Sequence, residues 1–168
     1  QRHSDKVDQL REVLNFFGVA SPSQWEELWL SPRAAFRQSP AFEADPYAVA
    51  AWLRMAEVEA QRLTAGKFDR DCFRGALDKA RALTVQPPEV FQMELVRLCA
   101  DCGVAVVFIP ALPRTRAWAA TRWLTKDKAL IQLSLRYKSD DHLWFSFFHE
   151  AGHILLHGKR DFFIEHTT

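Results

Sequence analysis

The sequence predicts an α+β fold, in which a helical N-terminal half leads into a small, mostly antiparallel sheet packed on one long helix. Apolar residues recur at helical spacing through most of the chain before residue 103. β-branched and aromatic runs typical of strands begin only at Val104, after a proline pair at 87–88. A segment with apolar residues over most of its circumference, 141–157, then follows as a helix. We therefore expect a helical connecting region over 1–84 and a second domain over 85–168.

A series of helices is expected before the first strand, each delimited by capping or breaking residues. Val7, Leu10, Leu14 and Phe17 repeat at helical spacing, and Gly18 supplies a stop. Proline in the first turn marks several of the following helices, because its missing N–H is not needed there. The expected helices cover about residues 7–17, 22–30, 32–39, 46–63, 69–83 and 89–101.

The strands are expected in the second half of the chain, before the long apolar helix. Lys126-Asp127-Lys128 fits a turn between two of them, and residues 129–135 alternate between apolar and polar side chains. Ser139-Asp140-Asp141 forms an N-cap cluster with acid at the positive end of the helix dipole. Gly158 then stops that helix. The expected strands cover residues 104–109, 118–124 and 129–135.

Composition sets broad limits on the class of protein. The chain has 168 residues, 48% hydrophobic and 26% charged, with a formal net charge of +1. These values are ordinary for a globular protein and give no bias toward nucleic acid or membrane. The chain begins without Met, so we expect a fragment of a longer polypeptide. Three cysteines do not suggest a disulfide framework, with Cys72 alone and Cys99 and Cys102 as buried apolar residues, so the expected compartment is the cytoplasm.

The apolar helix carries a group of residues suited to metal chemistry. His149 and His153 are four residues apart, so both imidazoles lie on one face and can bind one ion. Glu150 is rotated by about 100° from His149, which places it beside the metal, where it can hold a water molecule. This is the His-Glu-x-x-His pattern of zinc peptidases. It predicts Zn²⁺ on His149 and His153, with Glu150 as the catalytic base.

Burial gives a physical reason for a metal at this place. Two imidazoles and a carboxylate inside an apolar helix are costly unless they are paired or bind an ion. The alternative is a histidine pair satisfied by hydrogen bonds within the core. Gly152 costs about 1 kcal/mol relative to alanine inside a helix, and we expect a strand to approach the helix backbone there.

The helix also resembles a known family. The run from Phe145 to Gly158 resembles the helix of the ImmA/IrrE metallopeptidases, and the resemblance extends over about residues 83–164. The preceding helices resemble the connecting region of a subgroup in which a HigA-like helix-turn-helix regulator precedes the peptidase. That DNA-binding part would lie before residue 1.

The resemblance implies a gluzincin-like arrangement, with an acidic third ligand on a later helix. Only a short segment follows His153, so the third ligand is expected outside the chain, as part of a missing C-terminal portion. Glu165 is a second candidate for that ligand, against the alternative of a solvated tail residue. His157 is expected to cap helix carbonyls instead of binding the ion, because it lies about 12 Å from His149 along the axis.

The strand over 129–135 is a candidate for substrate binding. In His-Glu-x-x-His peptidases a strand in this position often presents an open edge, to which an extended substrate can pair. Gln132 and Ser134 are the expected substrate-binding residues, and a purely structural strand is the alternative. Basic residues dominate the surrounding segment, and we favour protection of strand edges over docking of an acidic partner as their role.

The expected function is zinc-dependent endopeptidase activity in transcriptional, stress or mobile-element regulation, with a repressor-type protein as the substrate. This role is implied by the family resemblance, as is contact with DNA only through the upstream domain. No membrane association is expected. The alternative is a non-catalytic regulator or antitoxin, whose peptidase-like domain senses a ligand, a metal or a partner.

Overall fold

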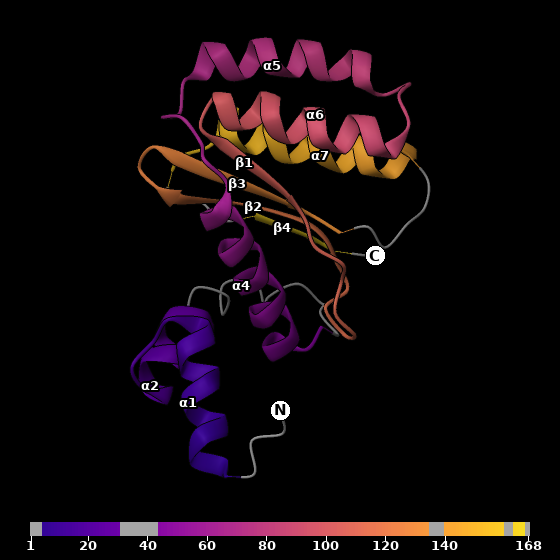
Figure 1. The fold of residues 1–168 in the computed structure, drawn as a ribbon. Helices are drawn as coiled ribbons and strands as arrows, with labels where there is room; N and C mark the ends of the chain where they lie inside the picture. Colours follow the sequence, from indigo (N-terminus) through magenta and orange to yellow (C-terminus); the bar gives the residue numbers. More distant parts are fainter. Residues whose placement is uncertain (1–4, 31–43, 135–139, 160–162, 167–168) are drawn as a thin grey trace.

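A mixed sheet forms the centre of an α+β fold in the computed structural model (Figure 1). The structure describes residues 5–30, 44–134, 140–159 and 163–166, with the side chains of residues 140, 165 and 166 excepted. The described strands form one 4-stranded sheet in the order β1-β3-β2-β4. They are β1 (Val104–Phe108), β2 (Ala117–Thr125), β3 (Lys128–Leu133) and β4 (Phe163–His166).

The strand pairings make the sheet mixed, although antiparallel pairs dominate as predicted. Strand β3 pairs in parallel with β1 and antiparallel with β2. Strand β2 also pairs antiparallel with β4, which occupies one end of the sheet. The helices cover both faces of this sheet (Figure 1).

Helices α6 and α7 lie on one face, with α5 outside α6, and α4 lies on the opposite face (Figure 1). The α1–α2 region lies beyond α4 (Figure 1). The bounds are α1 (Lys6–Phe17), α2 (Pro22–Trp25), the π-helical turn η1 (Glu26–Leu30), α4 (Pro46–Arg62), α5 (Arg70–Leu83), α6 (Pro88–Asp101) and α7 (Asp140–Leu156).

Side-chain alternation along the strands divides the apolar interior into two clusters. Val104 and Val106 of β1 belong to the cluster under α5, α6 and α7, whereas Ala105 and Val107 belong to the cluster under α4. Both clusters draw on residues from each side of the predicted boundary at 84/85. The two predicted segments therefore share their cores.

The predicted elements are largely confirmed. Each expected helix that falls on described residues is present, and Gly18 ends α1 with a left-handed φ of 67°. The expected helix over 22–30 divides into α2 and η1. The helix expected over 32–39 and the N-cap residue Ser139 lie outside the described residues. Strand β4 was not predicted.

Basic residues near the strands tie α4 to the sheet. Arg122 Nη1 lies 3.1 Å from Glu57 Oε1, and Arg122 Nη2 donates to the Leu53 carbonyl at 2.7 Å. Lys128 Nζ donates to the carbonyl oxygens of Ala60 and Leu63 at 2.7 and 3.1 Å, at the end of α4. Burial lowers the pKa of Arg122, and the negative charge of Glu57 partly offsets this decrease. These contacts favour a structural role for both side chains.

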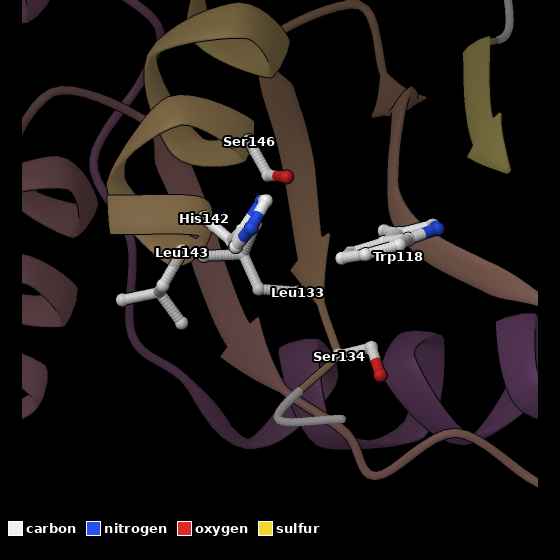
Figure 2. Close-up of a pocket in the computed structure, with 6 residues that line it drawn as sticks. All are labelled: Trp118, Leu133, Ser134, His142, Leu143 and Ser146. Atoms are coloured by element: carbon white, nitrogen blue, oxygen red, sulfur yellow. The ribbon is translucent and has the colours of Figure 1, made fainter. Parts of the chain in front are cut away.

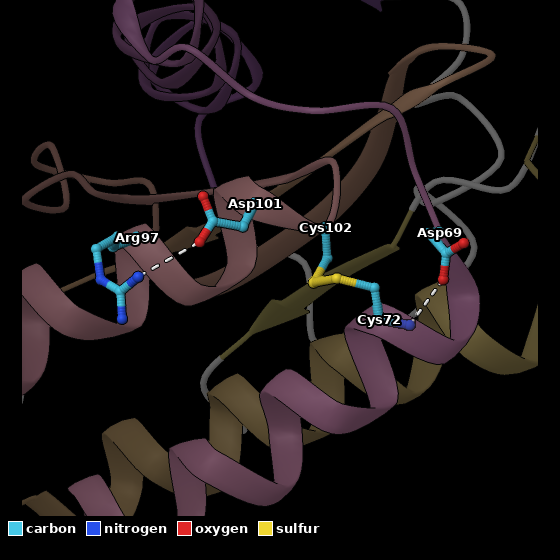
Figure 3. The surroundings of a disulfide bond; sticks show 5 residues. All are labelled: Asp69, Cys72, Arg97, Asp101 and Cys102. Atoms are coloured by element: carbon cyan, nitrogen blue, oxygen red, sulfur yellow. Dashed lines mark hydrogen bonds and ion pairs between the residues drawn. A yellow bond between two sulfur atoms is a disulfide. The ribbon is translucent and has the colours of Figure 1, made fainter.

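A disulfide bond joins Cys72 to Cys102, which makes the prediction of unpaired cysteines wrong (Figure 3). Cys72 lies in the first turn of α5, where its N–H donates to Asp69 Oδ1 at 2.7 Å. Cys102 follows the last residue of α6. Sequence spacing did not reveal the pair because the two residues are 30 positions apart and meet only when α5 packs on α6. Cys99 is buried and free, as predicted, and burial raises the pKa of its thiol to about 12.

The disulfide also bears on the expected compartment. Disulfides persist mainly in oxidising compartments, so the argument from unpaired cysteines for a cytoplasmic location no longer holds. Among the described helices, none combines the length and the apolar character needed to cross a bilayer.

Replacing Cys72 by alanine is expected to lower the free energy of unfolding by about 3–4 kcal/mol, because the bond closes a loop with a sequence separation of 30. Urea denaturation followed by circular dichroism, with and without reductant, measures the change. Reductant should destabilise the wild type and leave the variant unaffected. Cys99→Ala, which removes the buried free thiol, is the matched control and should remain sensitive to reductant. Equal stability of the wild type in both conditions would contradict the prediction.

Candidate metal centre

Helix α7 is held against the sheet by one apolar stripe. Trp144, Phe147, Ala151 and Ile154 recur at helical spacing and are 6% exposed or less. They pack in the cluster under α5, α6 and α7, and α7 contacts β2 and β3. This packing fixes the rotation of the helix. The histidines are offset from the buried stripe, with His149 exposed and His153 half-buried.

The two imidazoles converge on one point. His149 Nε2 and His153 Nε2 lie 3.1 Å apart, and the ring planes are nearly perpendicular at 89°. Two nitrogens bound to one tetrahedral zinc at about 2.0–2.1 Å would lie about 3.3 Å apart. The observed separation is within a few tenths of an ångström of the spacing that a shared ion requires. It is also the length of a hydrogen bond between the two imidazoles, which is the alternative for this pair.

Glu150 completes the cluster from the buried side. The residue is 0% exposed, and one carboxylate oxygen lies with the histidine nitrogens in a group whose atoms are all within 4.8 Å of one another. Thr121 of β2 is also buried, and its hydroxyl donates to the Glu150 carbonyl at 3.4 Å. This bond connects the backbone of α7 directly to the sheet, at the residue predicted to act as the base.

One phenylalanine ring stacks on each imidazole. The Phe163 ring stacks on His153 with centroids 3.8 Å apart and planes 7° from parallel, and Phe145 stacks on His149 at 6.0 Å. Burial lowers the pKa of His153, and the neighbouring His149 and His157 lower it further. A lowered pKa favours the neutral imidazole at pH 7, which is the form that binds metal.

The structure brings together the three residues that the motif predicted, His149, Glu150 and His153. His157 is outside this group. Its ring lies 5.2 Å from that of His153, and its backbone N–H donates to the His153 carbonyl at 3.0 Å in a helical hydrogen bond. Glu165 belongs to β4, where its backbone pairs with Ala119. The Glu165 side chain lies outside the described part of the structure, so its role as a ligand stays a prediction.

The prediction that the strand over 129–135 presents an open edge to the substrate is wrong. Strand β3 lies between β1 and β2, so both of its edges are already paired. Gln132 is 1% exposed, and its Nε2 donates to the Trp52 carbonyl at 2.8 Å, which joins β3 to α4. Ser134 follows β3, and its N–H donates to the Trp118 carbonyl. The local alternation was compatible with an edge strand, but the order of strands depends on contacts distant in sequence.

Two residues near the metal cluster were not predicted from the sequence. Phe163 reaches His153 only because β4 returns to pair with β2, and the short strand after Gly158 gave little periodic signal. Thr121 lay within an expected strand, where its polar side chain between Ala120 and Arg122 was the available signal. Its hydroxyl is buried against α7 and bonds to the backbone of the predicted base.

Comparisons of the chain with protein-family models, with curated proteins and with solved structures gave no match. The chemistry of the site is therefore the basis for assigning a function.

Gly152 is not explained by close packing. A Cβ atom at this position would meet nothing within 4 Å, so the expected approach of a strand is wrong. Gly152→Ala should therefore raise the free energy of unfolding by about 1 kcal/mol, because alanine has the higher helix propensity. Gly103 provides the contrast, since its φ is 79° and a Cβ there would lie 2.2 Å from the Phe68 nitrogen. Thermal unfolding should show stabilisation for Gly152→Ala and strong destabilisation for Gly103→Ala. Loss of stability in Gly152→Ala would contradict this account.

Proposed function

We propose that this chain is the core of a zinc-dependent peptidase, with His149 and His153 as metal ligands and Glu150 as the general base. The observation that carries the proposal is the 3.1 Å separation of the two Nε2 atoms beside a buried carboxylate. Imidazole is a preferred ligand of zinc, and a neutral His153 suits that role. The helix therefore presents a donor set that fits the metal.

Zinc, when bound, would supply a Lewis acid that polarises the scissile carbonyl and makes water more acidic. The protein's part is proton transfer. Glu150 would accept a proton from the attacking water and deliver it to the leaving amine nitrogen. Thr121 would hold Glu150 in place through the backbone of α7.

A catalytic zinc site uses three protein ligands. Two imidazoles lie in the described cluster, and a third ligand is proposed from Glu165 or from an acidic residue beyond the chain. The likeness of α7 to the ImmA/IrrE helix supports a gluzincin-like arrangement. It also supports a repressor-type protein as substrate, with DNA contacted through an upstream helix-turn-helix domain, and a cytoplasmic setting.

Zinc content tests the metal site directly. When the chain is purified without chelator, elemental mass spectrometry should find about one zinc per molecule. His149→Ala and His153→Ala should each lose most of it, because each removes a ligand. His157→Ala should retain the metal. Equal zinc in all four proteins would contradict the assignment of the ligands.

Cleavage tests the role of the base. Glu150→Gln should retain zinc and lose at least about 100-fold in peptide cleavage rate, because the amide cannot accept the proton. Glu27→Gln, at an exposed position of η1, is the matched control and should cleave at the wild-type rate. A wild type that binds zinc and cleaves no peptide would instead favour the alternative, a regulator whose peptidase-like domain senses a metal or a partner.

A further inference from the structure

A small pocket lies between the first half of α7 and strand β2 (Figure 2). His142 and Ser146 of α7 lie on one side of it and Trp118 of β2 on the other (Figure 2). Among the described residues, the lining consists of Trp118, Leu133, Ser134, His142, Leu143 and Ser146. The pocket is partly open, and its interior holds about one water-sized group. It therefore suits the end of a short side chain.

A β-bulge in β2 aims Trp118 into this pocket. Ala117 pairs with His166 and Ala119 with Glu165, so β2 has one residue more than β4 at this place. Without the bulge, Ala117 and Ala119 would face the same side of the sheet. Instead Ala117 packs under α4 and Ala119 packs under α7. The extra residue is Trp118, whose ring lies 5.7 Å from that of His142. Bulges commonly re-aim side chains beside active sites.

The pocket lies on the same stripe of α7 as the candidate metal centre. His142, Ser146, His149 and His153 are separated by four, three and four residues, which is helical spacing. Ser146 and His142 precede His149 by about 4.5 and 10.5 Å along the axis. An extended peptide advances about 3.3 Å per residue. Suppose that the scissile carbonyl of a bound peptide lies at the imidazoles. A residue at most about three positions from the scissile bond would then have its side chain over the pocket.

The chemistry of the lining selects the kind of side chain. Two serine hydroxyls and one imidazole can each donate and accept hydrogen bonds. Leu133, Leu143 and the Trp118 ring supply apolar walls. None of the described residues in the lining is lysine, arginine, aspartate or glutamate, so these walls offer a charged side chain no opposite charge to replace its hydration. A large apolar side chain would exceed the space and cover the hydroxyls.

We propose that this pocket is a specificity subsite that binds the hydroxyl end of a substrate serine or threonine within three residues of the scissile bond. The proposal rests on the proposed peptidase function. Ser134, His142 and Ser146 bind the substrate hydroxyl, and the Trp118 ring covers the carbon atoms of that side chain. The site thereby selects one residue of an otherwise extended peptide.

Cleavage of a randomised peptide library by the zinc-loaded chain tests the subsite, with products sequenced by mass spectrometry. Serine and threonine should be enriched at least fivefold at one position near the cut. The Ser134→Ala/Ser146→Ala double variant should lose that enrichment, and Ser23→Ala, at an exposed position of α2, should keep it. Cleavage without any preference, or an unchanged preference in the double variant, would overturn the subsite and leave the peptidase function standing.

Binding separates failure of the subsite from failure of the function. Glu150→Gln with zinc is titrated calorimetrically with polyalanine hexapeptides that carry one serine, leucine or aspartate at each position in turn. A serine peptide should bind at least fivefold tighter than its leucine and aspartate counterparts, and the two serine-to-alanine changes should abolish the difference. If the serine peptide binds more tightly in this way but the wild type cleaves no peptide, the subsite stands and the peptidase function is rejected. Equal binding of the three peptides, or no binding, would overturn the subsite.

Discussion

The burial of the Glu150 carboxylate beside two imidazoles is the constraint on which the rest of this structure depends. Such a group is costly in an apolar interior, yet α7 places it at 0% exposure on the side of the helix that faces the sheet. Packing of α7 on β2 and β3 fixes the rotation of the helix, and the Thr121 hydroxyl bonds to its backbone. Helix geometry thus brings the three groups together, and packing fixes how they face the sheet.

Much of the fold could be predicted because its signals are local. Helical periodicity, proline in first turns and glycine stops identified α1, α4, α5, α6 and α7, and β-branched runs identified β1 to β3. The site residues His149, Glu150 and His153 were predictable for the same reason, since helix geometry alone brings positions three and four apart onto one face.

The remaining features depend on contacts between distant parts of the chain. The disulfide requires α5 to lie on α6, and the covering of His153 by Phe163 requires β4 to return to β2. The place of β3 inside the sheet depends on strand order, so its alternating pattern suggested an edge that does not exist. The bulge at Trp118 likewise appears only when β2 and β4 are paired. Through the Trp118 ring, this bulge brings β2 beside His142, on the part of α7 that precedes the candidate metal centre.

The central claim is that the two imidazoles bind one metal ion. X-ray absorption spectroscopy of the zinc-loaded chain tests it most directly, because the fine structure reports the atoms around the metal and their distances. The account predicts scattering from two imidazoles at about 2.0–2.1 Å, reduced to one in His153→Ala. Zinc without imidazole scattering in the wild type, or a spectrum unchanged in the variant, would contradict it.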